Sequence, residues 1–312
     1  MNHRIVLGVD GGATKTLCLA LDRDRRVLGE GRAGASNPNS VGDGAARANL
    51  AAAITGALGE AGRAAEDVDA ICVGMAGVDR PAERAAVATW LAELLPGARA
   101  EIENDALIAL AGANDGDLFG VVVVSGTGMI VYGVNRAGAR RRAGGWGALI
   151  DLHGSGYAMG VAALRAIARA ADAIDAPTML TGAVLRHLQL TEIGQLIPWV
   201  YADLTWARFA ELAPVVVMCA ESGDAAAHAI VNQTAGGLAE AAAPVVRGLG
   251  LSDEAFPLVL AGGNLRPGPV YAQLTEQLRL AWPKAHIVAA GPPALGAALR
   301  ASYLRQARQL RL

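Results

Sequence analysis

Cysteine is scarce in this chain, and the few cysteines form no motif. The 312 residues include three, Cys18, Cys72 and Cys219, which lie far apart and make no CxxC pair. An odd and scattered set argues against a disulfide framework, a zinc site and an iron–sulfur cluster. We therefore interpret each cysteine as a small buried apolar side chain.

The chain also lacks an excess of either charge and a long uninterrupted apolar run. Lys and Arg total 27 against 29 Asp and Glu, a formal net charge of -2, unlike a nucleic-acid-binding protein or an acidic tail. The N-terminal apolar run breaks early at Gly-Asp-Gly-Gly, unlike a secretory signal, and charged residues interrupt the Ala-rich stretches. We expect a cytoplasmic protein with a small-molecule partner and no nucleic-acid or membrane partner. The sequence leaves open whether the chain forms a homodimer.

Short apolar runs recur in two segments of comparable order. Residues 5–33 contain apolar runs separated by a Gly-rich turn and a charged turn, which predicts three antiparallel strands. A segment from Val121 repeats this order, with a Gly/Thr turn and then a polar turn near Asn135. The two segments share too few identical residues for a sequence repeat, but they predict a structural one.

Helices and strands alternate between these segments. The periodicity predicts helices over residues 45–61 and 81–95, a buried strand over 70–74 and a strand that ends at Glu103. Alternation of this kind predicts a mixed sheet covered on both faces.

The remainder of the chain is mostly helical beyond Ser155. Two later strands are predicted, one running into Gly262 and one at residues 286–290, followed by a closing helix over 294–309. The predicted fold class is α/β, with two sheet-and-helix lobes and a cleft between them, and the closing helix returns to the first lobe. We assign residues 1–112 plus 293–312 to the N-terminal lobe and residues 113–292 to the C-terminal lobe.

A glycine turn follows the first predicted strand directly. Glycines let backbone N–H groups approach phosphate oxygens, and threonine hydroxyls add further donors. The ionised carboxylate at the start of the turn accepts hydrogen bonds only and is suited to hold Mg²⁺ through water. A plain Asp-Gly hairpin turn is the alternative, but we favour phosphate binding, without a Walker or GxGxxG fingerprint. The motif comprises Asp10, Gly11, Gly12, Thr14, Lys15 and Thr16.

Two further glycine turns end predicted strands. The second, Ser125-Gly126-Thr127-Gly128, occupies the same point in the second segment as the first turn does in the first. Two such turns facing each other would clamp a polyphosphate from both sides. The third, Gly262-Gly263, would leave a flat surface for a nucleotide base or ribose, although strand-Gly-Gly is also a frequent structural turn.

Carboxylate and amide side chains supply the remaining candidates. Asp105 closes a strand and opens a helix, where it is either a helix N-cap or a base that takes the proton of an attacking hydroxyl. Asn37 and Asn39 lie in a loop where amides either stabilise a turn or read sugar hydroxyls or an acetamide.

Taken in order, seven segments resemble the BadF/BadG/BcrA/BcrD-type ATPase family, specifically its N-acetylglucosamine kinase branch within the actin/hexokinase/Hsp70 superfamily. The resemblance spans nearly the whole chain. The segments are VDGGATKT, SNPNSVG, GMAGVDRP, ENDA, SGTGM, GGWG and LAGGN.

This resemblance implies a fold and an activity. The fold would be a pair of ribonuclease-H-like (actin-like ATPase) domains with an interdomain cleft that closes on substrate. The activity would be ATP- and Mg²⁺-dependent phosphorylation of the primary hydroxyl of an amino sugar, N-acetylglucosamine first, with Asp105 as the base. Glucosamine and N-acetylmuramic acid are alternative substrates. The sugar pocket would be lined by Asn37, Asn104, Thr127, Gly145 and Trp146.

One segment departs from the family pattern. After GGWG and three residues the family reads Gly-Asp-Glu-Gly-Ser, whereas this chain reads Asp151-Leu152-His153-Gly154-Ser155. Either the turn is reshaped so that Asp151 still faces the sugar, or the sugar contacts differ. His153 either donates to a sugar hydroxyl or replaces a surface Glu.

The departure leaves open a class of function other than a kinase. A non-catalytic, nucleotide-dependent sugar sensor would tolerate it, although a sensor has no need of a base such as Asp105. An ATPase that activates a dehydratase, as in the wider family, would need cluster-forming cysteines that this chain does not have.

Overall fold

The computed structural model describes residues 4–12, 14–75, 78, 80–151 and 153–309. Five residues of the segments quoted above lie outside the described residues: Ala13, Ala76, Gly77, Asp79 and Leu152. The chain divides into two compact units. Unit 1 comprises Met1–Val122 and Val288–Leu312, and unit 2 comprises Val123–Ile287.

Unit 1 is built on a five-stranded mixed sheet of order β3-β2-β1-β4-β5. β1, β2 and β3 are antiparallel neighbours, which confirms the predicted three-stranded segment, and β4 and β5 extend the sheet parallel to β1. The strands are β1 (Ile5–Gly11), β2 (Thr16–Leu21), β3 (Val27–Ala33), β4 (Val68–Met75) and β5 (Arg99–Glu103).

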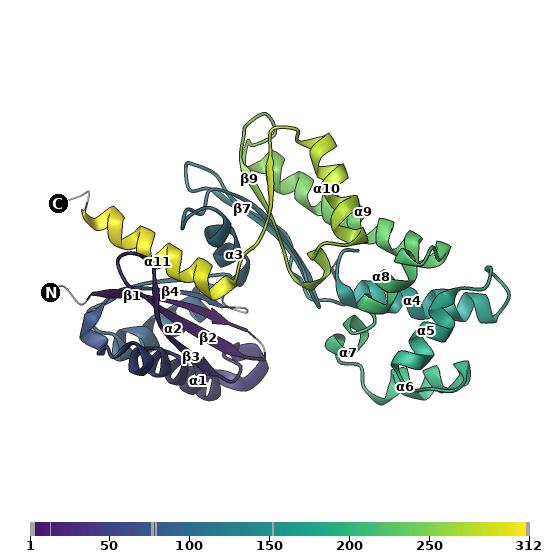
Figure 1. Cartoon of the computed structure of the whole chain (residues 1–312), viewed down its shortest axis with the longest axis horizontal. Helices are drawn as coiled ribbons and strands as arrows, with labels where there is room; N and C mark the ends of the chain where they lie inside the picture. The colour runs from purple at the N-terminus through teal and green to yellow at the C-terminus, as the bar shows by residue number, and fades with distance from the viewer. Residues whose placement is uncertain (1–3, 13, 76–77, 79, 152, 310–312) are drawn as a thin grey trace. The chain divides into compact units, whose positions relative to one another are not determined.

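Helices cover both faces of this sheet, because alternate residues of a strand point to opposite faces. Leu7 of β1 packs in a cluster with α1 and α2, whereas its neighbour Val6 packs in a second cluster with α3 and α11. Figure 1 shows α1 and the C-terminal helix α11 on opposite faces. The closing helix α11 thus packs on the sheet of unit 1. The helices are α1 (Pro38–Ala61), α2 (Pro81–Leu94), α3 (Asp105–Ala113) and α11 (Pro293–Gln309).

Unit 2 carries a second five-stranded sheet, of order β10-β9-β6-β7-β8. Its strands are β6 (Gly120–Ser125), β7 (Met129–Val134), β8 (Arg140–Gly144), β9 (Pro257–Ala261) and β10 (His286–Ala289). β7 and β8 pair antiparallel. The two sheets, each with helices, establish the α/β class.

Most of unit 2 between β8 and β9 is helical, as predicted. The helices are α4 (Gly156–Ala171), α5 (Met179–His187), α6 (Leu196–Ala202), α7 (Trp206–Ala210), α8 (Ala213–Glu221), α9 (Ala225–Gly248) and α10 (Pro269–Ala281). Short 3-10 helices are η1 (Ala65–Asp67), η2 (Ile193–Gln195) and η3 (Gly263–Leu265). Among the described helices none is long and apolar enough by itself to cross a membrane; the sharply bent pair Trp206–Glu221 and Ala225–Gly248 meets the length and composition criteria together.

Candidate active site

The carboxyl ends of three parallel strands of unit 1 meet at one edge of its sheet. Asp10 of β1 is in register with Gly74 of β4, and Gly74 is in register with Glu103 of β5. Strands lie about 4.8 Å apart, so the Asp10 and Glu103 backbones are about 10 Å apart. Asn104 and Asp105 follow Glu103 directly. The structure therefore brings residues Asp10 and Asp105 to the same edge of the sheet.

The first glycine turn and the Asn37 loop are held together at this edge. Gly12 N–H donates to the Lys15 carbonyl at 3.0 Å, which closes the turn. The N–H groups of Ser36 and Asn37 donate to the Gly12 carbonyl at 3.1 and 3.3 Å. The predicted phosphate-binding and sugar-binding segments are thus neighbours within unit 1. Ser36, which the sequence did not single out, is buried here, and its hydroxyl has no hydrogen-bond partner in the described structure.

The side chains of the first turn differ in what they can bind. Thr16 is buried, and its hydroxyl donates to the Gly34 carbonyl at 2.7 Å, so it stabilises the fold. Thr14 and Lys15 are exposed. Burial raises the pKa of Asp10 above its ordinary value, and the Lys15 ammonium lowers it in part.

A single carboxylate such as Asp10 fits Mg²⁺ that arrives with a nucleotide. Mg²⁺ is usually held by one or two carboxylates, water and substrate phosphates rather than by an all-protein cage. The described residues contain no cluster of three His, Cys, Asp or Glu that could hold a metal by themselves. Asp10 would hold the ion there, directly or through water, and the ion would supply charge neutralisation on the phosphates.

The two amide side chains that were predicted to line the sugar pocket, Asn37 and Asn104, are helix N-caps. Asn104 Oδ1 accepts from the Ala106 N–H at 2.9 Å and caps α3, and Asn37 Oδ1 accepts from the Asn39 N–H at 2.9 Å and caps α1. The N-cap of α3 is therefore Asn104, and Asp105 is the first helical residue, half-buried.

In unit 2 the second glycine turn is held by Asn264. Ser125 is fully buried; its hydroxyl donates to the Gly154 carbonyl and accepts from Asn264 Nδ2 at 3.1 Å. Asn264 Nδ2 also donates to the Gly126 carbonyl at 2.9 Å. The turn itself closes from Gly126 N–H to the Gly128 carbonyl at 2.9 Å. Asn264 stands in the LAGGN motif, but its role as a link between two predicted turns could not be inferred from sequence order.

The start of α4 supports the same turn from another direction. Gly156 N–H donates to the Gly126 carbonyl at 2.7 Å, and Tyr157 N–H donates to the Thr127 carbonyl at 3.2 Å. Ser155 is buried and caps α4 by accepting from the Ala158 N–H at 3.1 Å. Since Gly262 packs on the backbone of Ser125, the structure brings the second and third glycine turns together. Thr127 remains exposed at the tip.

Asp151 stabilises the GGWG turn. Its Oδ1 accepts from the Trp146 N–H at 3.0 Å, and Gly145 N–H donates to the Met129 carbonyl at 3.0 Å. Burial raises the Asp151 pKa, partly opposed by these backbone donors and by Arg142. Trp146 is exposed, with the Arg142 guanidinium 4.9 Å from its ring.

His153, in the segment that departs from the family pattern, contacts α9. Its Nε2 lies 3.0 Å from Gln233 Nε2 on that helix, within hydrogen-bond distance. The His153 ring thus has a protein partner at the surface of unit 2.

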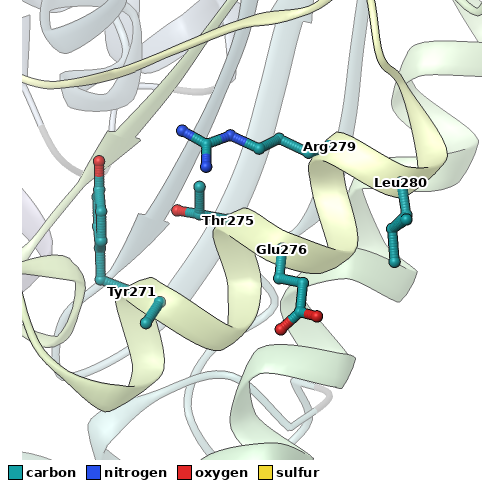
Figure 2. Close-up of a pocket in the computed structure, with 6 residues that line it drawn as sticks. Tyr271, Thr275, Glu276, Arg279 and Leu280 are labelled. Carbon is teal, nitrogen blue, oxygen red and sulfur yellow. The ribbon is translucent and has the colours of Figure 1, made fainter.

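A separate cavity of about 410 Å³ lies along α10 in unit 2. Figure 2 shows Tyr271, Thr275 and Arg279 on one side of the helix, with Glu276 and Leu280 on another. None of the six residues that line it, all on α10, belongs to the predicted site. The cavity therefore gives no support to any of the predicted contacts.

Known proteins resemble this chain over nearly its whole length. The model of the BadF/BadG/BcrA/BcrD ATPase family matches residues 7–301. An N-acetyl-D-glucosamine kinase from Dictyostelium discoideum is 38% identical over 96% of this chain and 98% of its own length. An N-acetylmuramic acid/N-acetylglucosamine kinase from Clostridium acetobutylicum is 33% identical over 91% of this chain and 94% of its own.

A solved structure shares both the fold and part of the sequence. The crystal structure of a candidate N-acetylglucosamine kinase from Chromobacterium violaceum has a TM-score of 0.72 and 29% identity, covering 95% of this chain and 98% of that one. Together with the family match, this extends the likeness through both units. The chain is a member of the BadF/BadG/BcrA/BcrD ATPase family.

Proposed function

We propose that this chain is a sugar kinase that transfers the γ-phosphoryl group of ATP to the primary hydroxyl of an amino sugar, N-acetylglucosamine first. The observation that carries the proposal is the single sheet edge in unit 1 that holds Asp10, the first glycine turn, the Asn37 loop and Asp105. The two relatives that are 38% and 33% identical are both named as kinases of N-acetylglucosamine.

Asp105 is proposed as the base. The oxygen of the sugar's primary hydroxyl attacks the γ-phosphorus, its proton passes to the Asp105 carboxylate, and the bond between γ-phosphorus and the bridging oxygen of ADP breaks. Phosphoryl transfer depends mainly on positioning and on charge stabilisation, so the base need only orient and accept one proton. Asp105 is the first residue of α3, and the Asn104 cap fixes the start of that helix.

The two glycine turns are proposed as the phosphate-binding elements. Backbone N–H groups of Gly11, Thr127 and Gly128 and the exposed side chains of Thr14, Lys15 and Thr127 would contact phosphate oxygens. The N–H groups of Gly12 and Gly126 instead close their own turns. Gly262 and Gly263 would carry the nucleoside. The buried Thr16 and Ser125 contribute by fixing their turns rather than through their own hydroxyls.

A substrate panel tests the proposal directly. The purified chain is incubated with ATP and Mg²⁺ and with N-acetylglucosamine, glucosamine, N-acetylmuramic acid or a common hexose, and products are identified by mass spectrometry. We expect the 6-phosphate of N-acetylglucosamine with the highest kcat/KM. No sugar phosphate from any compound would exclude the proposal and leave the non-catalytic sensor, which nucleotide-dependent sugar binding without turnover would reveal.

The dehydratase activator receives no support from the cysteines. Cys18, Cys72 and Cys219 are free and buried in the structure, and burial raises the thiol pKa of each, the opposite of a ligand poised as thiolate. Three free thiols are typical of a reducing compartment, in keeping with a cytoplasmic enzyme.

The Asn264 link gives a prediction on ATP. Asn264→Ala removes two hydrogen bonds, to Ser125 Oγ and the Gly126 carbonyl, each worth about 1 kcal/mol. We expect the KM for ATP to rise about tenfold, or about 1.4 kcal/mol, with the KM for sugar within twofold of wild type, measured by steady-state kinetics.

Asn135→Ala is the matched control. Asn135 Nδ2 also donates to a backbone carbonyl of unit 2, that of Leu249 at 3.2 Å, but in the polar turn between β7 and β8. Equal rises in both variants would mean that general loosening, rather than the link between the turns, determines the KM for ATP.

A further inference from the structure

Two carboxyl side chains of β5 point into the layer between the sheet of unit 1 and its C-terminal helix. Glu101 and Glu103 are two residues apart on the strand and so share a face. Glu101 is in register with Cys72 of β4, and Cys72 packs in a cluster with Ala297, Ala298 and Ala301 of α11. Glu103 is 2% exposed. Both carboxyls therefore lie beneath α11, directly before Asn104 and Asp105.

Arg300 of α11 binds the Glu101 carboxylate through two nitrogens on one edge of its guanidinium. Nε lies 3.0 Å from Oε2 and Nη2 lies 2.9 Å from Oε1, a bidentate pair that fixes orientation as well as distance. The two side chains are 13% and 19% exposed. The third nitrogen, Nη1, donates to the Gly116 carbonyl at 3.2 Å. Arg300 thus holds the strand before α3 and the turn after it.

Glu103 is a neighbour of this ion pair. The Glu103 carboxyl lies close to that of Glu101. Burial raises the pKa of Glu101, Arg300 lowers it, and Glu103 raises it. The three side chains therefore form one largely buried charged group beneath α11.

Backbone packing leaves this arrangement little freedom. A Cβ placed on Gly296 of α11 would lie 2.0 Å from the Ile108 carbonyl oxygen of α3 and 2.9 Å from Gly112 N. α11 and α3 thus touch backbone to backbone one turn before Arg300, so a shift of the α11 backbone at this point would displace α3.

From this geometry we infer that Arg300, Glu101 and Glu103 are positioning residues, which set the angle and depth at which α3 presents Asp105. The inference rests on the proposed role of Asp105 as base. A buried ion pair is weak support for stability, since apolar residues of similar size often replace one without loss. Its function here is orientation: a displacement of about 1 Å at a reacting group lowers a rate as much as 100-fold.

The test separates orientation from stability. Glu101→Leu with Arg300→Met replaces both charges by apolar side chains. We expect the double variant to unfold within a few degrees of wild type while kcat falls about tenfold or more, with both KM values within twofold. Wild-type kcat in this variant would overturn the inference.

Arg300→Lys keeps the result decisive if the double variant does not fold. Lysine retains the charge but not the fork, so we expect a folded protein whose kcat falls about fivefold or more. A kcat within twofold of wild type would overturn the inference.

The matched control is Arg169→Lys, which alters an exposed bidentate pair with Asp175 in unit 2 (2.6 and 2.9 Å) and should leave kcat unchanged. An equal fall there would also count against positioning. Failure of the proposed function looks different, because the wild-type chain would then make no sugar phosphate.

Discussion

Replacing Asp105 by Asn lowers kcat about 100-fold or more while ATP still binds, if Asp105 takes the proton of the sugar hydroxyl. The amide has nearly the shape of the carboxylate but cannot accept the proton. Asn104 remains the cap of α3 through Ala106 N–H, so the helix stays in place. The measurement is kcat with saturating sugar and ATP, with nucleotide affinity determined by calorimetry.

Asp115→Asn controls for the loss of charge. Asp115 lies just beyond the other end of α3 and is ion-paired with Arg25 at the surface. Both substitutions remove one negative charge near one helix, and the carboxylate at the N-terminus contributes about 0.3–1 kcal/mol through the helix dipole. We expect Asp115→Asn to keep wild-type kcat. A small effect of Asp105→Asn on kcat would rule out Asp105 as the base.

Much of the fold follows from periodicity in the sequence. The apolar runs before Gly11 and Ser125 predicted strands, and the structure has β1 and β6 there. The periodicity predicted only part of α1: the predicted helix begins at residue 45, whereas α1 begins at Pro38. Gly42, at φ 77°, interrupts its helical geometry, and this break hides the first turn from any pattern based on a regular helix.

The order of motifs predicted family membership, but the contacts that hold the motifs did not follow from it. Asn264 and Ser125 are 139 residues apart, and Arg300 and Glu101 are 199 apart. No local spacing relates such pairs, since they meet only after both sheets and their helices have packed. The sequence also predicted that Thr16 and Ser125 bind phosphate. Their burial did not follow from it, because burial of a hydroxyl in a turn depends on neighbours that are remote in the chain.

Gly262→Ala is expected to damage the second and third glycine turns together. Gly262 adopts φ 98°, and a Cβ at this position would lie 2.1 Å from the Ser125 carbonyl oxygen. The left-handed backbone costs an alanine about 1–3 kcal/mol, and relief of the overlap costs about 1–3 kcal/mol more. Because both contacting groups are backbone, the strain must displace Ser125. We expect the KM for ATP to rise about tenfold or more and thermal stability to fall.

Gly263→Ala is the matched comparison one residue away. Gly263 is the first residue of η3, and a Cβ there would meet nothing within 4 Å. The same added methyl group should therefore leave thermal stability unchanged, whereas its effect on the KM for ATP reports whether the nucleoside lies against this surface. Equal stability of the two variants would mean that Gly262 does not fix the Ser125 turn, and an unchanged KM for ATP in both would place the nucleotide site away from these two turns.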